Sequence, residues 1–303
     1  MRFGPASDGV IAGWARELGL PGLVDIHVHF LPQRVLRKVW AYFDEAERHY
    51  GVSWPVWYRH TEQRRLAMLR QFGVERFAPL VYPHKPGMAR WLNEWVRQFA
   101  EEVPDAVPTA TLYPEPDVSG YVEEAVRAGA RCVKVHVQVG AFDPRDPVLD
   151  PAWGMLADAG VPVVVHCGHG PLRGEYTGVD VFAEVLAKHP RLTAVLAHAG
   201  MPEFDRALAL LERYPRVYLD TTMVGTPFSE RLMKLPADWA ARLADVPHRV
   251  ALGTDFPNIP YPYATQLRAI AQWADADERL GEPFLRAVLY ETPKALLNGA
   301  RGR

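Results

Sequence analysis

Two histidines stand two residues apart at the end of an early apolar segment, Leu23-Val24-Asp25-Ile26-His27-Val28-His29-Phe30. Side chains two residues apart in a strand point to the same face, so His27 and His29 should converge. Two imidazoles aimed at one point are suited to holding a metal ion. A buried strand that merely carries two histidines is the alternative, and the rest of the chain has to supply the missing ligands.

Polar side chains also follow most of the other predicted strands. At least six of the 11 histidines stand at such strand ends, which scatter over surface helices would not produce. The side chains presented are His27 and His29 after the first strand, Tyr82 and His84 after the second, Lys134 and His136 after the fourth, His166 after the fifth, His198 after the sixth and Asp255 after the eighth.

A strand followed by a helix recurs eight times from Leu23 onward, after a lead-in with a short predicted helix at 9–18. The predicted strands are 23–27, 76–81, 107–112, 132–137, 161–165, 192–197, 217–220 and 249–253. The predicted helices between and after them are 88–102, 118–128, 152–159, 179–188, 203–213, 237–244, 263–275 and 282–297. Eight such units predict an α/β fold, a closed (β/α)₈ TIM barrel. An open doubly wound sheet should carry a glycine-rich loop after its first strand, and residues 27–32 contain no glycine.

The helical pattern at 31–70 is predicted to be an insertion after the first strand, broken near 51–55. It is rich in aromatic residues, with seven between positions 40 and 58. We expect them mainly to fill space against the barrel or at a subunit interface, and a lid over a site is the sharper alternative. The whole chain, 1–303, is predicted to form a single barrel domain.

The strand-end residues gather at one mouth of a barrel, where the sites of this fold lie. Three neutral imidazoles and one carboxylate suit Zn²⁺ or a similar divalent ion, with one position left for water. Such an ion lowers the pKa of bound water to about 7. Asp255 could bind the ion through one oxygen and accept the proton through the other, while His198 could hydrogen-bond the water or polarise the substrate.

The same residues carry a resemblance to a known family. Asp25-Ile26-His27-Val28-His29-Phe30-Leu31-Pro32, histidines after strands five and six, and Gly253-Thr254-Asp255-Phe256-Pro257 resemble the amidohydrolase superfamily. They look most like its branch that includes aminocarboxymuconate-semialdehyde decarboxylase, over about residues 23–297. The resemblance implies a divalent metal, most simply one Zn²⁺ with Mn²⁺, Fe²⁺ or Co²⁺ as alternatives. It also implies His27, His29, His166 and Asp255 as ligands and His198 as a catalytic residue.

Lys134 leaves the number of metals open. In binuclear members of the superfamily a lysine on strand four is carboxylated and bridges two metals, and His198 would then bind the second. In the resembled branch one metal is usual, and the lysine contacts substrate or packs. We expect one metal here. A buried lysine paired with a neighbouring carboxylate is the alternative for Lys134.

Six further polar residues are candidates for substrate binding near the predicted mouth. A guanidinium such as that of Arg173 can grip a carboxylate with two hydrogen bonds. Ordinary polar loop residues are the alternative for all six, which are His136, His169, Arg173, Tyr82, His84 and Asn258.

Three functions compete for this set of residues. Hydrolysis of a small-molecule amide, lactone or ester is favoured, and non-oxidative decarboxylation of an unsaturated or aromatic acid is the runner-up. The segment His198-Ala199-Gly200-Met201-Pro202-Glu203 departs from the glycine-rich run frequent in the decarboxylases. A structural metal in a barrel without activity is disfavoured, because the ligands come from distant strands.

Composition limits the remaining classes. A net charge of −2 with no block of like charge does not suggest a nucleic-acid or membrane partner. The two cysteines form no disulfide framework, and no signal core or membrane span is apparent. We expect a cytoplasmic protein with a small-molecule substrate, and the aromatic insertion makes a homodimer plausible.

Overall fold

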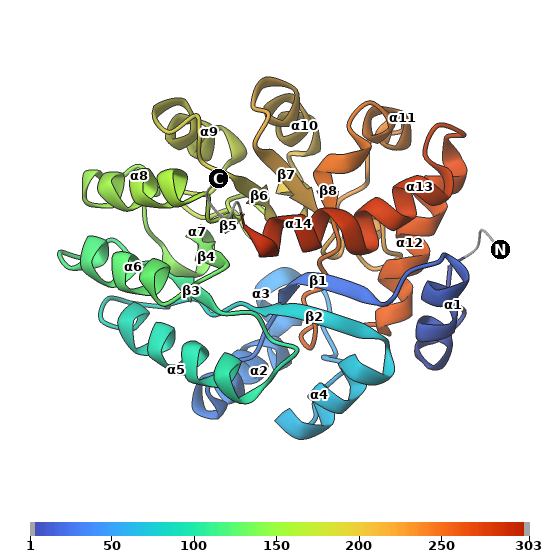
Figure 1. Cartoon of the computed structure of the whole chain (residues 1–303), viewed down its shortest axis with the longest axis horizontal. Coiled ribbons are helices and arrows are strands. Elements are labelled where there is room, and N and C mark those ends of the chain that lie inside the picture. Colours follow the sequence, from blue (N-terminus) through green and yellow to red (C-terminus); the bar gives the residue numbers. More distant parts are fainter. Residues whose placement is uncertain (1–3, 300–303) are drawn as a thin grey trace. The chain divides into compact units, whose positions relative to one another are not determined.

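Strands and helices alternate along the computed structural model, which describes residues 4–299 (Figure 1). The eight strands in this range are β1 (Leu23–Val28), β2 (Val74–Pro79), β3 (Thr109–Thr111), β4 (Cys132–His136), β5 (Val163–His166), β6 (Ala194–Leu196), β7 (Val217–Asp220) and β8 (Val250–Ala251). The α-helices are α1 (Ile11–Glu17), α2 (Gln33–Asp44), α3 (Ala46–Tyr50), α4 (Glu62–Gln71), α5 (Ala89–Glu102), α6 (Val118–Arg127), α7 (Val137–Gly140), α8 (Asp150–Ala159), α9 (Val179–Lys188), α10 (Phe204–Arg213), α11 (Trp239–Ala244), α12 (Tyr263–Ala276), α13 (Gly281–Arg286) and α14 (Thr292–Asn298).

Each predicted strand is present, with ends that move by up to two residues. The largest early difference is β2, which starts at Val74 instead of Arg76, directly after Gly73. Gly73 has a φ of 80°, a left-handed conformation that favours glycine, and it accepts a hydrogen bond from the Leu23 amide. The turn therefore delivers the chain into β2 earlier than hydrophobicity alone indicates.

The predicted last helix is interrupted. Instead of one helix over 282–297, the chain forms α13, a π-helical segment at Ala287–Glu291 and then α14. The short helix α7, directly after β4, was not predicted either. Its first turn is capped by His136, whose Nδ1 accepts a hydrogen bond from the Val139 amide at 3.3 Å. A histidine cap is unusual among capping residues, which explains why the pattern did not indicate it.

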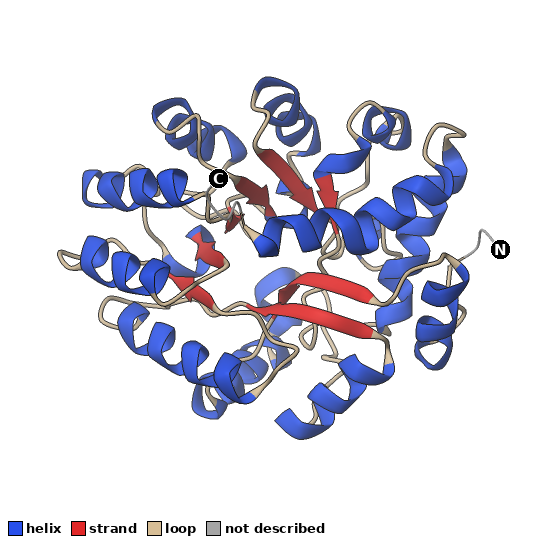
Figure 2. Cartoon of the chain, in the orientation of Figure 1, coloured by secondary structure: helices blue, strands red, loops and turns tan. Residues whose placement is uncertain are grey.

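The chain divides into two compact units. One runs to Phe77 and then takes in Thr221–Pro293, and the other comprises Ala78–Asp220 and continues from Lys294. In the second unit β3, β4, β5, β6 and β7 form a parallel sheet in sequence order. Helices α5, α6, α8, α9 and α10 lie outside these strands (Figure 2). In this register His136 on β4 lies beside His166 on β5.

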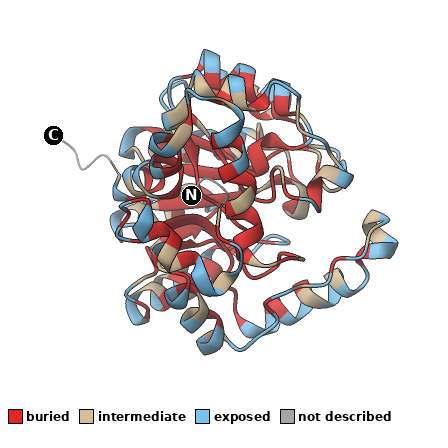
Figure 3. Ribbon diagram, turned by 90° about the vertical axis from the view of Figure 1, so that its right-hand side faces the viewer, coloured by how far each residue is buried: buried red, intermediate tan, exposed pale blue. Residues whose placement is uncertain are grey.

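The first unit is built around β1, all six residues of which are buried. Its backbone pairs with the loop after β8: the Ile26 amide donates to the carbonyl of Leu252, and Val28 forms a parallel bridge with Phe256. Apolar residues at both faces of the strands fill the interior, while the outer helix faces are exposed (Figure 3). The pairing brings the end of β1 next to the residue after Asp255.

The predicted insertion at 31–70 forms α2, α3 and most of α4, with a break after Gly51. Two of its tryptophans hold one loop of the same unit. The indole of Trp40 donates to Oδ1 of Asn258 at 3.0 Å, and the indole of Trp54 donates to the Asn258 carbonyl at 2.7 Å. Tyr42 and Trp57 are exposed, at 45% and 54%. Part of the aromatic set thus packs within this unit, while two rings remain on its surface.

No helix among residues 4–299 is both long enough and apolar enough to cross a membrane.

Candidate metal centre

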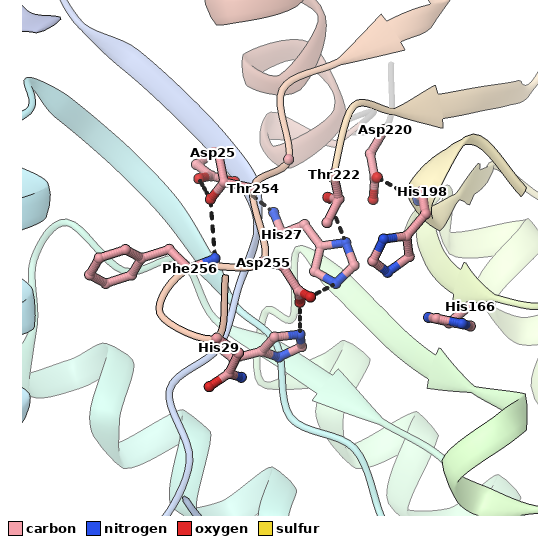
Figure 4. Close-up of polar contacts among 12 residues, drawn as sticks. Asp25, His27, His29, His166, His198, Asp220, Thr222, Thr254, Asp255 and Phe256 are labelled. Atoms are coloured by element: carbon pink, nitrogen blue, oxygen red, sulfur yellow. Dashed lines mark hydrogen bonds and ion pairs between the residues drawn. The ribbon is translucent and has the colours of Figure 1, made fainter. Parts of the chain in front are cut away.

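His27, His29 and Asp255 converge in the first unit (Figure 4). One ligand atom from each lies within 4.8 Å of the other two. Nε2 of His29 is 2.8 Å from Oδ1 of Asp255, and Nε2 of His27 is 3.6 Å from the same oxygen. Both imidazoles are buried, whereas the Asp255 side chain keeps 14% of its surface exposed. The cluster therefore has a protected side and a side open to solvent.

A threonine sets the orientation of one imidazole. Oγ1 of Thr222 lies 3.1 Å from Nδ1 of His27, and Thr222 is fully buried. When Nδ1–H donates to this hydroxyl, Nε2 is left as the deprotonated nitrogen that faces Asp255. This is the tautomer that a metal ligand needs.

A buried carboxylate joins β1 to the loop after β8. Oδ1 of Asp25 accepts a hydrogen bond from the His27 amide at 3.0 Å. Oδ2 accepts from the hydroxyls of Thr254 at 2.6 Å and Tyr263 at 2.8 Å. Asp25 thereby ties the backbone of one cluster histidine to the residue that precedes Asp255. Burial and the neighbouring Asp25 carboxylate raise the pKa of Tyr263 well above its usual value, so that the phenol stays a donor.

The Asp25 connection continues to the N-terminal segment. The amide of Tyr263 donates to the Tyr58 hydroxyl at 2.6 Å, and that hydroxyl donates to the Asp8 carboxylate. The other carboxylate oxygen of Asp8 accepts from the Ala264 amide at 2.9 Å. Burial and the Asp8 carboxylate raise the pKa of Tyr58. The start of α12 is thus fixed by residues from three separate segments.

Backbone strain marks Asp255 itself. Its φ is 69°, in the left-handed region that non-glycine residues rarely occupy. The amides around it are fixed, because the Asp255 amide donates to the His27 carbonyl at 2.8 Å and the His29 amide donates to the Phe256 carbonyl at 2.7 Å. These bonds hold the strained turn in the position that presents the carboxylate to both imidazoles.

Three other candidate histidines come together in the second unit. The rings of His136 and His166 stack with centroids 4.1 Å apart, and the His198 ring lies 4.7 Å from that of His166. Nε2 of His166 is 2.7 Å from the Gly170 carbonyl. A carbonyl only accepts, so Nε2 carries the proton and Nδ1 is the nitrogen whose chemistry suits a cation.

His198 also has a strained backbone. Its φ is 54° and that of Ala199 is 49°, two consecutive left-handed residues. The His198 amide donates to Oδ1 of Asp220, a fully buried carboxylate at the end of β7, at 2.8 Å. Asp220 therefore holds the turn that aims the His198 side chain.

Lys134, Tyr82 and His84 are further candidates of the second unit. Lys134 is fully buried on β4. Tyr82 lies with its ring centroid 5.0 Å from that of His136 and 5.4 Å from that of His84. These aromatic contacts put Tyr82 and His84 at the same strand ends as the histidine group.

Two loop candidates of the second unit are unlike one another. Nδ1 of His169 is 2.8 Å from the hydroxyl of Thr177, and its Nε2 is 3.5 Å from Glu203. Arg173 is exposed. In the first unit, Asn258 is 2% exposed and its side-chain oxygen is engaged by Trp40. The substrate-binding roles of the six candidates stay predictions.

The chemistry of the donor set in the first unit fits a divalent ion. Two imidazole nitrogens and one carboxylate oxygen are ligands that Zn²⁺, Mn²⁺, Fe²⁺ and Co²⁺ all accept. A metal-binding histidine usually donates a hydrogen bond from the ring nitrogen that does not bind the metal. The Thr222 hydroxyl gives His27 such a partner.

Sequence reasoning missed the residues that support this cluster: Asp25, Thr222, Thr254 and Tyr263. One signal was available, because Asp25 stands two residues before His27 and shares its strand face. The others are distant in sequence and could not be found from spacing.

Comparison with protein families matches residues 24–299 of this chain to the amidohydrolase family. A comparison with curated proteins finds no match.

Solved structures with the same fold agree on the architecture. An uncharacterised TIM-barrel protein from Bordetella bronchiseptica has a TM-score of 0.71 at 19% identity, over 91% of this chain and 98% of that one. An amidohydrolase from Burkholderia multivorans with bound zinc has a TM-score of 0.61 at 17% identity, over 92% and 99%.

A third structure is a candidate 2-pyrone-4,6-dicarboxylic acid hydrolase from Pseudomonas putida, with a TM-score of 0.58 at 17% identity, over 92% and 98%. These likenesses confirm the (β/α)₈ TIM-barrel fold predicted from the strand rhythm. The family match covers nearly the whole chain, and the protein belongs to the amidohydrolase family.

Proposed function

We propose that this amidohydrolase-family enzyme hydrolyses a small-molecule amide, lactone or ester of a carboxylic acid, with one divalent metal ion, most simply Zn²⁺. The observation that carries the proposal is the convergence of His27, His29 and Asp255 on one point, with Asp255 reaching solvent. In this proposal His166 completes the ligand set and His198 is a catalytic residue, as the family resemblance predicts.

A divalent ion held by these residues would supply Lewis-acid chemistry, since it polarises a carbonyl group and acidifies water. The chain's own groups do the rest. His27 and His29 would supply imidazole nitrogens as ligands. The Thr222 hydroxyl orients the His27 ring, and the backbone bond from the His29 amide to the Phe256 carbonyl holds His29 in place. Asp255 would be one of the residues that hold the ion, and its carboxylate would act as the general base that accepts a proton from the attacking water. His198 donates a hydrogen bond to the developing oxyanion of the substrate.

The chemistry of the similar proteins supports hydrolysis. The Pseudomonas putida protein is described as a hydrolase of a pyrone, which is a cyclic ester, and the Burkholderia multivorans protein holds zinc. Decarboxylation of an unsaturated or aromatic acid uses the same residues and is therefore the alternative outcome of the test.

The experiment is an assay of the zinc-loaded protein on matched substrates. Aryl esters, lactones and anilides report hydrolysis, and hydroxybenzoic and muconic acids report release of CO₂. We expect hydrolysis that is lost on chelation and restored by zinc. CO₂ release without hydrolysis would replace the proposal by the alternative, and metal-independent turnover would contradict both.

The cytoplasmic location, the homodimer and the absence of nucleic-acid and membrane partners stay predictions.

A further inference from the structure

Two tryptophans of the insertion after β1 hold one residue of the loop after β8. The indole of Trp40, on α2, donates to the side-chain oxygen of Asn258 at 3.0 Å, and the indole of Trp54 donates to the carbonyl oxygen of the same residue at 2.7 Å. Asn258 is 2% exposed and Trp54 is 7% exposed. Both bonds are therefore largely shielded from water, and a hydrogen bond is stronger in such surroundings.

Asn258 is in turn bonded to Asp255. Its amide donates to the Asp255 carbonyl at 2.8 Å, so the two residues close the turn that begins at the strained Asp255 backbone. The other end of this turn is fixed by β1, because the Asp255 amide donates to the His27 carbonyl. The shape of the turn decides where the Asp255 carboxylate points, which is toward both imidazoles of the cluster (Figure 4). The two indoles thus hold the end of the turn that β1 does not reach.

The indoles are themselves fixed in place. The Trp54 ring packs against the ring of Phe228, with centroids 4.9 Å apart. The guanidinium of Arg59 donates to the Trp40 carbonyl at 3.1 Å and lies 5.5 Å from the centre of the Trp40 ring. Each donor is therefore preorganised for its bond to Asn258, and preorganised groups lose little conformational entropy when they bond.

The insertion also begins beside the cluster. It starts just after His29, whose amide donates to the Phe256 carbonyl inside the turn at 2.7 Å. One continuous segment therefore follows a cluster histidine and, through its tryptophans, holds the far end of the Asp255 turn. A change in the position of Asp255 relative to His29 is consequently felt at the two indole bonds to Asn258.

We propose that Trp40 and Trp54 are positioning residues for the metal centre, because through Asn258 they hold the turn that presents the Asp255 carboxylate to a divalent ion. The inference rests on the proposed metal-dependent function and gives the aromatic insertion a part in it. Neither indole touches the ion or the reacting atoms. Coupling of this kind is reciprocal: if the indole bonds favour ion binding, a bound ion favours the indole bonds by the same factor.

The first test compares zinc affinity among variants of the full-length protein. Trp40→Phe and Trp54→Phe remove the N–H donor and keep an aromatic ring. Trp57→Phe is the matched control, because the Trp57 side chain is 54% exposed and it is the backbone amide that bonds the same loop, at the Ile259 carbonyl. With a chromophoric chelator as competitor, we expect Zn²⁺ to bind W40F and W54F about three- to tenfold more weakly than the wild type and W57F, the usual weight of one hydrogen bond.

Tryptophan fluorescence separates this role from packing. Zn²⁺ has no redox chemistry, so a change of emission when it binds reports a change around the indoles. We expect this change in the wild type and in W57F, and a smaller one in W40F and W54F, which each lack a responding indole. A purely structural role would lower the melting temperatures of W40F and W54F and leave zinc affinity and the zinc-induced emission change of the folded protein as they are.

Equal zinc affinity in the wild type and all three variants overturns the proposal. A zinc-induced emission change that both W40F and W54F retain in full does so as well. If W54F does not fold, the comparison of W40F with W57F decides, because the Trp40 side chain is only half-buried and a smaller ring leaves less of a cavity there.

These outcomes are independent of turnover. Zinc affinity that depends on Trp40 and Trp54, in a protein without hydrolase activity, would keep the positioning role and remove the proposed reaction. Metal-dependent hydrolysis together with equal zinc affinity in all the variants would do the reverse.

Discussion

The hydroxyl of Thr222 lies 3.1 Å from Nδ1 of His27, while Nε2 of the same ring faces Asp255. Thr222 stands 195 positions away in the sequence, two residues past the end of β7. One hydroxyl thus determines which nitrogen of a candidate ligand is available to a cation.

Replacing Thr222 with Val should weaken metal binding. Valine has nearly the shape of threonine, so packing should be kept while the hydrogen bond to Nδ1 is lost. We expect about a 10- to 100-fold loss of Zn²⁺ affinity, the usual effect of removing a hydrogen bond behind a ligand. Competition with a chromophoric chelator measures it. Thr222→Ser keeps the hydroxyl and should behave like the wild type, and equal affinities in all three proteins would exclude this role.

Replacing Asp25 with Asn should damage both stability and metal binding. The carboxylate accepts bonds from an amide and two hydroxyls, and the amide NH₂ of asparagine must face one of these donors. We expect a loss of about 1–3 kcal/mol in the free energy of unfolding, measured by urea titration, and weaker Zn²⁺ binding. Tyr263→Phe removes one donor only, and it should cost less. A fully stable Asp25→Asn variant with unchanged metal affinity would contradict the positioning role.

Replacing Asp255 with Asn should leave the protein folded and lower kcat/KM by about 10²- to 10⁴-fold, because asparagine cannot accept the proton. Circular dichroism checks folding, and the hydrolysis assay measures the rate. Asp245→Asn, which changes a surface carboxylate that pairs with Arg279, is the control and should keep full activity. Full activity of D255N would remove the proposed mechanism.

Tyr58 should make stability fall at alkaline pH. Its native pKa is raised above the unfolded value near 10, so the unfolded chain loses the proton first. Its contribution is complete below pH 10 and declines above it, by up to about 1.4 kcal/mol per pH unit. Tyr58→Phe should cost about 1–3 kcal/mol at pH 7, since it leaves the Tyr263 amide unpaired, and should show a shallower alkaline decline. Urea titrations from pH 7 to pH 11 measure the free energy of unfolding of the wild type and of the variant. If the two proteins lose stability in parallel as the pH rises, Tyr58 does not have this role.

Metal analysis should give one equivalent of divalent ion per chain. Lys134 is fully buried, and we expect it to be uncarboxylated. Elemental analysis counts the ions, and mass spectrometry of the intact protein under native conditions reports any added CO₂. Two equivalents together with a carbamate on Lys134 would favour the binuclear arrangement instead.

Much of the architecture followed from the sequence because buried parallel strands are apolar throughout and the helices between them are punctuated by glycine. β7 and α9 match their predicted bounds. The π-helical segment at Ala287–Glu291 could not be found, since its residues are compatible with an ordinary helix and packing decides the register.

The cluster was partly predictable for a similar reason. His27 and His29 are paired by strand geometry alone, and Asp255 by its place after a strand. Supporting residues such as Thr222 depend on contacts between distant segments, which no local pattern encodes.

The positive φ values of His198, Ala199 and Asp255 mean that the fold gives up conformational free energy at these turns, roughly 1–3 kcal/mol each. Glycine would relieve this strain at all three places, but Ala199 alone among them is not a proposed site residue. Selection for heat resistance should therefore accept Ala199→Gly readily and keep His198 and Asp255 unchanged. Thermophilic descendants of this chain would then differ from it at position 199, in an otherwise unchanged turn.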